Sequence, residues 1–184
     1  MTELKEDILE MWQYKVYKDF LDKDTFNKLK DNILNDEDLN KHDFDTGQYR
    51  KFLNYDPTPQ IADKLKDFDK HRSYEELKSF IHYAVTPKNF IHVVHDEAAY
   101  KIMSAIIYLS PEVSCGTFLH DKFENPTETI EVEWEPNSLM VFCGEKNVTW
   151  HHFESKDAHR YTYNYFLVDP TKIKKQEYKK YAIG

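Results

Sequence analysis

The chain has 184 residues and a formal net charge of −8, and 15% of its residues are aromatic. This length is typical of one domain with a substantial core, and we expect a single domain over residues 1–184. The acidic balance argues against broad contact with nucleic acid or an anionic membrane, since phosphate groups attract clustered Lys and Arg. No run approaches the roughly 20 apolar residues of a membrane span. The two cysteines cannot build a disulfide framework, so a reducing, cytoplasmic location is expected.

The first 88 residues are expected to form a mainly helical flank with one short strand. Apolar residues recur at helical spacing over residues 4–12 and again over residues 26–34. The second stripe follows Asp24-Thr25, which offers a helix cap. Residues 14–20 alternate in the manner of a strand, so we expect a strand before this helix.

Two further segments of the first half carry predictions. Residues 35–56 are polar and are expected to form a loop with an edge strand near residues 49–55. Another helix is expected to begin at Ser73 and to carry the apolar residues as far as Ile81. Thr86-Pro87 would end it, because the residue before a proline is pushed away from helical dihedral angles.

From residue 89 onward the hydrophobic period changes to the period of two that is typical of strands. Strands are expected at residues 90–94, 102–109, 129–134, 139–142, 148–153 and 161–168. Helices followed by short, closely spaced strands predict the α+β class, predominantly β, with an antiparallel sandwich or barrel. Residues 118–129 are expected to form a loop that, like residues 35–56, borders the substrate entrance.

Three residues form a candidate metal site. His95 and Glu97 are two positions apart, so on a strand their side chains point to the same face. His151 is a second imidazole much later in the chain. Two imidazoles and one carboxylate on one side of a metal ion leave its other side open, which is the ligand set of non-haem Fe(II) oxygenases.

Two neighbouring histidines leave the choice of ligands open. The residue two positions after His92 is Val94, which cannot bind a metal. The pair His95 and Glu97 is therefore preferred. His152 has the opposite strand parity to His151 and is expected to face away from the metal. Either neighbour remains an alternative to a proposed ligand.

Arg160 opens an otherwise uncharged strand, nine residues after His151. A buried cation without an anion would be costly, so the position favours a carboxylate-bearing molecule beside the metal. Thr162 has the same strand parity as Arg160 and is a candidate to touch that molecule. Thr117 and Asn164 are further candidates to face the site.

From residue 89 to residue 170 the order of motifs resembles that of the 2-oxoglutarate- and Fe(II)-dependent dioxygenases, within them the prolyl-4-hydroxylase-like branch. That branch has a His-x-acid pair, a strand ending in Tyr-Leu, a Gly-Gly-Thr-like turn, a Pro-x-x-Gly-like turn before a strand ending in Phe, a second histidine and an arginine opening the last strand. Here these features are His95-Asp96-Glu97, Ile107-Tyr108-Leu109-Ser110, Cys115-Gly116-Thr117-Phe118, Pro136-Asn137-Ser138-Leu139-Met140-Val141-Phe142, His151 and Arg160-Tyr161-Thr162. Two residues depart from the pattern: Glu97 stands where aspartate is usual, and Cys115 replaces the first glycine of the turn.

The resemblance implies a double-stranded β-helix, a cupin-like jelly roll flanked by N-terminal helices. Residues 89–170 would be its catalytic core and residues 171–184 a basic C-terminal tail. It also implies hydroxylation of a C–H bond with release of succinate and CO2. A prolyl residue in a peptide or protein is the leading substrate, and a small molecule is the alternative.

The resemblance further implies which residues act. His95, Glu97 and His151 would bind Fe(II), and Arg160 would bind the far carboxylate of 2-oxoglutarate with help from Tyr108 and Thr162. Dioxygen is the second co-substrate, and ascorbate is a candidate reductant.

Two rival functions come from other classes. One is a cupin-like metal enzyme that shares the jelly roll but does not use 2-oxoglutarate, and so would not need Arg160. The other is a non-catalytic jelly-roll binding module in which the metal-ligand pattern is incidental. Succinate release on addition of 2-oxoglutarate separates both rivals from the dioxygenase.

Overall fold

The computed structural model describes residues 12–173. The helix expected over residues 4–12 lies outside this range except for Trp12, as does most of the tail expected over residues 171–184. The main elements are β1 Tyr14–Tyr17, α2 Lys23–Leu34, β2 Tyr49–Leu53, α3 Gln60–Phe68, β3 Lys78–Thr86, β4 Lys101–Ser110, β5 Thr117–His120, β6 Thr129–Val132, β7 Leu139–Cys143, β8 Trp150–Phe153 and β9 Arg160–Val168. No described helix is long and apolar enough to cross a membrane.

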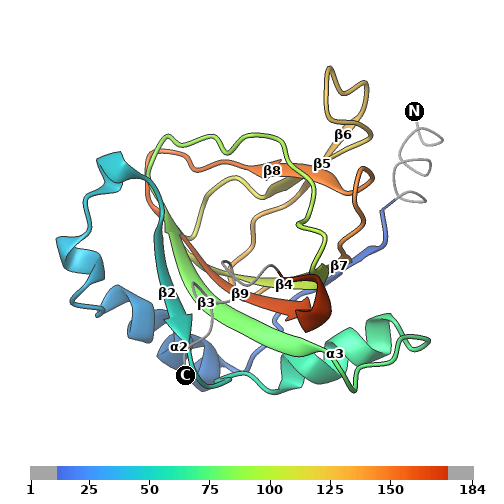
Figure 1. The fold of residues 1–184 in the computed structure, drawn as a ribbon. Helices are drawn as coiled ribbons and strands as arrows, with labels where there is room; N and C mark the ends of the chain where they lie inside the picture. Colours follow the sequence, from blue (N-terminus) through green and yellow to red (C-terminus); the bar gives the residue numbers. More distant parts are fainter. Residues whose placement is uncertain (1–11, 174–184) are drawn as a thin grey trace.

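The strands form two antiparallel sheets that face each other. The larger has the order β1-β7-β4-β9-β3-β2, and the smaller has the order β6-β5-β8. Figure 1 shows α2 and α3 on the outer side of the larger sheet, away from the smaller one. This arrangement confirms the predicted α+β class, predominantly β, with a jelly roll and helices from the N-terminal half beside it.

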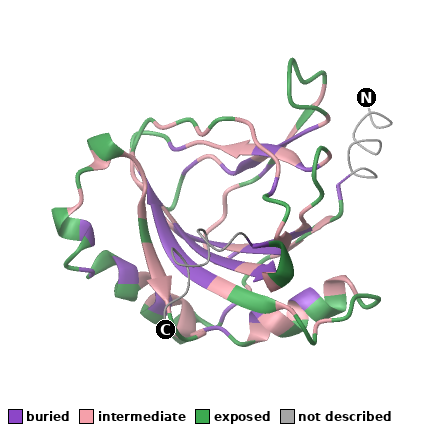
Figure 2. Ribbon diagram, in the orientation of Figure 1, coloured by how far each residue is buried: buried purple, intermediate pink, exposed green. Residues whose placement is uncertain are grey.

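Strand alternation divides the larger sheet into two chemically different faces. On β9, Tyr163, Tyr165 and Leu167 belong to the main hydrophobic core, together with Ile33 of α2 and Ile61 of α3. Residues of the other parity on the same strand face the smaller sheet, since Thr162, Asn164 and Phe166 line a pocket there. Figure 2 shows how much of the larger sheet is buried. One face therefore anchors the helices and the other is left to carry a site.

Two predictions about the helices need correction. The helix expected from Ser73 is wrong: β3 covers Lys78–Thr86 and pairs with β9 over its whole length. The aromatic and β-branched side chains of this segment fill positions between β2 and β9, and this tertiary pairing outweighs the helical spacing of its apolar residues. The cap expected at Asp24-Thr25 is also wrong. The residue that caps α2 is Asp22, whose Oδ1 accepts from the backbone N–H groups of Asp24 and Thr25.

Two other predictions fail around the smaller sheet. The strand expected at residues 90–94 is absent, and only isolated bridges join Ile91 to Glu154 and His95 to His151. Ile91 and its neighbour Val93 are 67% and 75% exposed, so burial does not hold this segment in a regular strand. The loop expected over residues 118–129 begins instead with β5, which pairs with both β6 and β8.

Candidate active site

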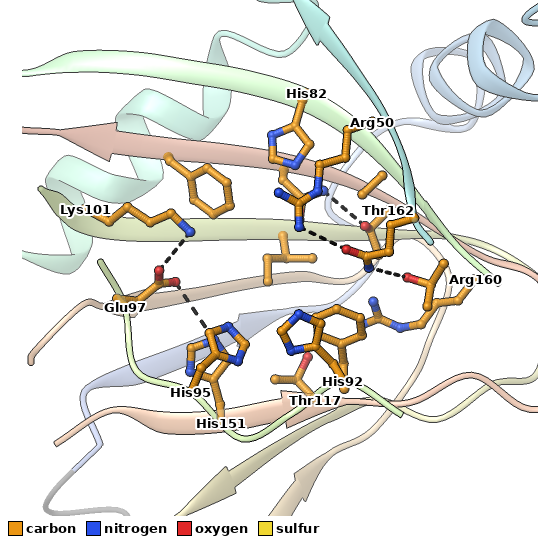
Figure 3. Close-up of a pocket in the computed structure, with 17 residues that line it drawn as sticks. Arg50, His82, His92, His95, Glu97, Lys101, Thr117, His151, Arg160 and Thr162 are labelled. Carbon is orange, nitrogen blue, oxygen red and sulfur yellow. Dashed lines mark hydrogen bonds and ion pairs between the residues drawn. The ribbon is translucent and has the colours of Figure 1, made fainter. Parts of the chain in front are cut away.

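A pocket between the two sheets gathers the three predicted metal ligands together with Arg160 and Thr162. Its lining comes from the inner face of the larger sheet, from β5 and β8, and from the segment before β4. The lining residues are Gln48, Arg50, His82, Ala84, Thr86, His92, His95, Glu97, Lys101, Ile106, Thr117, His151, Phe153, Arg160, Thr162, Asn164 and Phe166. Figure 3 shows that His82 and Arg50 enter from the wall opposite His95 and His151.

Backbone pairing brings His95 and His151 together across 56 positions of sequence. Each residue donates its backbone N–H to the other's carbonyl, at 3.0 and 2.8 Å. Their ring centroids are 4.3 Å apart. His151 is also fixed by edge contacts with Trp12 and Phe142, at 5.9 and 5.3 Å between centroids. The two imidazoles are therefore held side by side by the fold.

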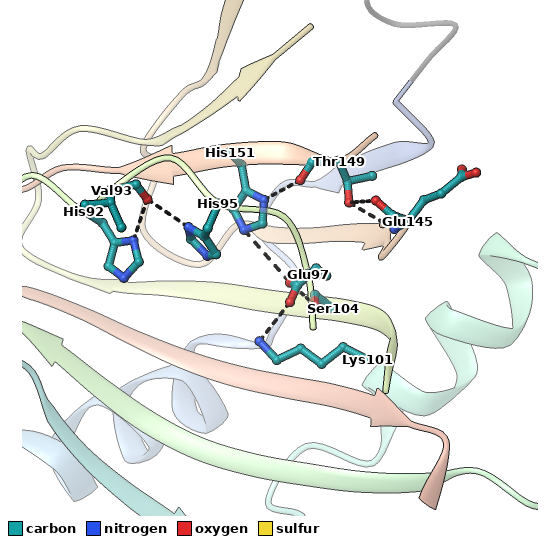
Figure 4. A network of polar contacts seen from close by, with 9 residues as sticks. All are labelled: His92, Val93, His95, Glu97, Lys101, Ser104, Glu145, Thr149 and His151. Carbon is teal, nitrogen blue, oxygen red and sulfur yellow. Dashed lines mark hydrogen bonds and ion pairs between the residues drawn. The ribbon is translucent and has the colours of Figure 1, made fainter. Parts of the chain in front are cut away.

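Hydrogen bonds to backbone carbonyls fix the tautomer of both imidazoles (Figure 4). The Nδ1–H of His95 donates to the Val93 carbonyl at 3.0 Å, and that of His151 donates to the Thr149 carbonyl at 2.8 Å. Each Nε2 atom therefore keeps a free lone pair, the form in which histidine binds a metal. Burial and the nearby His151 lower the pKa of His95 to about 4, and burial lowers the pKa of His151. Both rings are thus neutral at physiological pH.

Glu97 completes the cluster as a buried anion. Its Oε1 atom lies 4.0 Å from the His151 Nε2 atom and accepts the Ser104 hydroxyl at 2.7 Å. Its Oε2 atom lies 2.9 Å from the Lys101 ammonium. Burial alone would raise the pKa of Glu97, but the charge of Lys101, the nearby His151 and the hydrogen bonds from Lys101 and Ser104 together outweigh it and lower the pKa to about 2. Gly144 leaves room for this side chain, because a Cβ atom there would lie 3.0 Å from the Glu97 Cβ atom.

The three side chains have the chemistry that a divalent metal needs. Two free Nε2 lone pairs and one ionised carboxylate are the donors such an ion needs, and the backbone bonds of the imidazoles supply the outer support. As the side chains lie, residues 12–173 contain no group of three His, Cys, Asp or Glu already spaced for an ion. Glu97 is instead held by Lys101, so metal binding requires its carboxylate to turn from Lys101 toward the imidazoles.

Arg160 lies in the same pocket. It is a buried cation, and two of its hydrogen-bond donors are unused. It is 3% exposed, and its Nε and Nη2 atoms have no hydrogen-bond partner. Its guanidinium carbon lies 4.9 to 5.3 Å from the ring centroids of Tyr108, Trp134 and Phe153. Burial lowers its pKa to about 10, which leaves the group charged at neutral pH. An anion in the pocket would best satisfy the free donors and the positive charge of this arginine.

The other residues predicted to bind the co-substrate surround Arg160. Thr162 and Thr117 line the pocket, whereas Tyr108 lies behind it and its hydroxyl bonds the Thr117 hydroxyl at 2.9 Å. The residue before Thr117 has to be a glycine, since a Cβ atom on Gly116 would lie 1.7 Å from the Val132 carbonyl oxygen.

The two alternative histidines are placed differently. His152 lies on the opposite face of β8 from His151, as strand parity predicts, and its ring stacks on Phe118 and bonds His120 at 2.7 Å. His92 does border the pocket, and its ring centroid is 4.5 Å from that of His95. His92 therefore remains the one neighbouring alternative inside the pocket.

Comparison with solved structures supports the fold described above. The sequence matches no protein-family model and no curated protein. The structure is similar to a prolyl-4-hydroxylase from Pseudomonas putida, with a TM-score of 0.65, 15% identity and coverage of 88% of this chain and 96% of that chain. It is similar to a prolyl hydroxylase from Trichoplax adhaerens in complex with a hypoxia-inducible-factor peptide fragment, with a TM-score of 0.67, 13% identity and coverage of 94% and 95%. HygX from Streptomyces hygroscopicus, with nickel and 2-oxoglutarate bound, gives a TM-score of 0.58, 9% identity and coverage of 92% and 88%.

The chain has the prolyl-hydroxylase fold. This result confirms the double-stranded β-helix that the order of motifs implied, over nearly the whole length of the chain. A shared fold does not fix a reaction, so the activity of this prolyl-hydroxylase-like chain has to be argued from the residues in its pocket.

Several residues of the pocket were not identified from the sequence. Arg50 and His82 lie on β2 and β3, and Lys101 opens β4. An edge strand was expected near residues 49–55, but nothing in the sequence indicated which face would meet the pocket. His82 was not identified because its segment has the apolar spacing of a helix.

His82 gives the folded chain a specific sensitivity to acid. Burial and the cations Arg50 and Lys101 lower its pKa to about 3, below the ordinary value of 6.5. As the pH falls below 6.5 the unfolded chain takes up this proton while the folded chain does not, so stability is present above that pH and is lost toward pH 3. Between pH 7 and pH 5 we expect the free energy of unfolding to fall by about 2 kcal/mol more in the wild type than in His82→Phe. Urea unfolding at both pH values measures this difference, and equal losses would contradict it.

Proposed function

We propose that the protein is an Fe(II)- and 2-oxoglutarate-dependent dioxygenase that hydroxylates a C–H bond, with a prolyl residue in a peptide or protein as the leading substrate. Succinate and CO2 are the products formed from the co-substrate. The observation that carries this proposal is the buried guanidinium of Arg160, with unpaired donors, in the same pocket as His95, Glu97 and His151. A metal enzyme that did not use 2-oxoglutarate would have no evident need for it.

In this proposal His95, Glu97 and His151 hold Fe(II). When bound, the metal and the co-substrate supply the activation of dioxygen that oxidises the substrate. The backbone carbonyls of Val93 and Thr149 fix the orientation and tautomer of the two imidazoles, and burial keeps both rings neutral. Thr149 is itself fixed, because its hydroxyl donates to the Glu145 carbonyl at 2.9 Å and accepts from the Glu145 N–H at 3.0 Å.

At the other end of the pocket Arg160 orients the co-substrate. Its planar fork matches a carboxylate with two parallel N–H donors, and the surrounding aromatic rings exclude water from that contact. Thr162, on the same face of β9, supplies a further hydroxyl. Tyr108 has an indirect part in this proposal, since it holds Thr117 and packs against the guanidinium.

The substrate and the cellular setting belong to the same proposal. A Trichoplax adhaerens relative in fold was solved with a peptide fragment, which supports a peptide substrate here. Dioxygen as second co-substrate and ascorbate as reductant follow from the reaction class. Cys115 and Cys143 are both free thiols, which favours a reducing cytoplasmic location in which iron stays ferrous.

The test is a succinate assay with Fe(II), 2-oxoglutarate and a library of prolyl peptides. We expect succinate in the presence of wild-type protein, at a higher rate with accepted peptides than without peptide. A metal-dependent reaction without any use of 2-oxoglutarate would favour the cupin-like enzyme. A melting temperature unmoved by Co(II) and 2-oxoglutarate would favour the non-catalytic module, since a ligand of the folded state must raise it.

Lys101 is expected to compete with the metal for Glu97. Its side chain is 21% exposed, and its ammonium lies 2.9 Å from the Glu97 Oε2 atom. In Lys101→Met the buried carboxylate loses this partner, so the metal-free protein should lose roughly 1–3 kcal/mol of stability. Added Co(II) then replaces the missing charge and should raise the melting temperature of the variant more than that of the wild type.

Differential scanning fluorimetry with and without Co(II) measures both effects of the Lys101 variant. Lys28→Met, at an exposed position of α2, is the matched control and should behave as the wild type does. An equal or smaller Co(II) response in Lys101→Met would show that Lys101 does not compete for Glu97.

A further inference from the structure

A second hollow adjoins the pocket that contains Arg160. We call it the aromatic cleft and define it by four of its lining residues, Phe52, Phe80, Tyr100 and Phe166. Phe166 lies six residues after Arg160 on β9, roughly 20 Å along an extended strand. The two hollows share Arg50, His82, His92, His95, Glu97, Lys101 and Phe166. Two of the three candidate metal ligands, His95 and Glu97, therefore border the aromatic cleft as well as the pocket of Arg160.

The sheet gives the aromatic cleft a wall of aromatic rings, and the Lys101 ammonium lies 3.8 Å from the ring centroid of Phe166. Phe52 is paired in register with His82, and their ring centroids are 5.1 Å apart. Phe166 is paired with Phe80, and its ring centroid is 5.3 Å from that of His82. Aromatic faces of this kind bind flat or ring-shaped apolar groups. The pyrrolidine ring of a prolyl residue is such a group.

Arg50 adds a cation at the junction of the two hollows. Its Nη2 group donates to the Gln48 Oε1 atom at 2.9 Å, and no carboxylate of residues 12–173 forms an ion pair with it. The other charged side chains of the cleft have protein contacts. Lys101 pairs with Glu97, and the Asp96 Oδ2 atom accepts the Asn147 N–H at 2.9 Å. Most of the donors of Arg50 therefore remain for a ligand.

We infer that Arg50 binds a carboxylate of the substrate, next to the apolar ring received by the aromatic cleft. This inference rests on the proposed function and names its substrate class: a prolyl peptide that carries an anionic group beside the proline. The carboxylate could come from an acidic side chain or from the C-terminus of the peptide. In both cases the planar fork of Arg50 supplies the matching donors.

Four short prolyl peptides test the inference in the succinate assay. Three are amidated and carry Glu, Gln or Lys after the proline, and the fourth ends in proline with a free carboxylate. With wild-type protein we expect the KM of the Glu peptide or of the free-carboxylate peptide to be roughly five- to tenfold below that of the Gln peptide. The preference should weaken at high salt, because Arg50 lies at an exposed position.

Charge reversal provides the sharper comparison. Arg50→Glu should lose the preference for the carboxylate and favour the Lys peptide. Lys88→Glu makes the same change of charge at an exposed position outside both hollows and should keep the wild-type order of peptides.

The outcomes separate this inference from the proposed function. Equal KM values for all four peptides, or no stimulation by any of them, would overturn the inference while succinate release from 2-oxoglutarate still supported the dioxygenase. An unchanged preference in Arg50→Glu would also overturn it. A wild-type protein that neither binds nor consumes 2-oxoglutarate would overturn the proposed function and this inference with it.

Discussion

Replacing His151 by alanine is expected to abolish succinate release and to weaken Co(II) binding by more than about 100-fold. Loss of an outer-shell partner of a metal ligand already costs about 10- to 100-fold, so loss of a ligand itself should exceed this range. The His151 imidazole lies beside His95, and its Nε2 atom lies 4.0 Å from the Glu97 Oε1 atom. His152, the next histidine along β8, faces the other way and does not take that position. Co(II) titration by calorimetry measures the loss.

The neighbouring residue supplies a matched control. His152→Ala removes an imidazole from the same strand but from the opposite face, where it contacts Phe118 and His120. We expect this variant to retain Co(II) affinity and turnover, with at most a modest loss of stability. Equal loss of Co(II) binding in both variants would indicate that the damage is structural and would contradict the assignment of His151.

The second large effect is expected at Arg160. Arg160→Met removes the charge-assisted contact with the carboxylate of 2-oxoglutarate, which is worth roughly 1.5–3 kcal/mol, or about 10- to 150-fold in dissociation constant. The same change relieves the ligand-free protein of a buried cation whose Nε and Nη2 atoms are unpaired. We therefore expect the ligand-free variant to be at least as stable as the wild type but to lose most of its thermal response to 2-oxoglutarate.

Two controls distinguish the charge of Arg160 from its packing. Arg160→Lys keeps the charge without the planar fork and should fall between wild type and Arg160→Met in co-substrate affinity. Arg72→Met changes an arginine paired with Asp69 outside the pocket and should leave the affinity unchanged. An unaltered 2-oxoglutarate response in Arg160→Met would remove this residue from the proposed site.

The C-terminal half of the fold was predictable because its strands carry their own signal. The long strands at residues 102–109 and 161–168 were expected within one residue of β4 and β9, since their runs are nearly uninterrupted by charge. Strand parity also placed Thr162 on the pocket side with Arg160. These features depend only on period and composition, which a single sequence shows.

Other features depend on partners that the sequence does not show. The segment that leads into β3 has the apolar spacing of a helix at Tyr74, Leu77 and Ile81, and only pairing with β2 and β9 makes residues 78–86 a strand. The opposite error occurred at residues 90–94, whose β-branched residues form only one isolated bridge, from Ile91 to Glu154 just after β8. Arg50 and His82 were missed for the same reason, because their place in the pocket follows from the order of strands in the sheet.

The most direct test of the account is a crystal structure of the protein with Co(II) and 2-oxoglutarate, with anomalous diffraction recorded at the cobalt edge. The account predicts one anomalous peak within bonding distance of His95, Glu97 and His151, with a carboxylate of 2-oxoglutarate against Arg160. A peak held by other residues, such as His120 of β5 and His152 of β8, or a co-substrate bound away from Arg160, would contradict it.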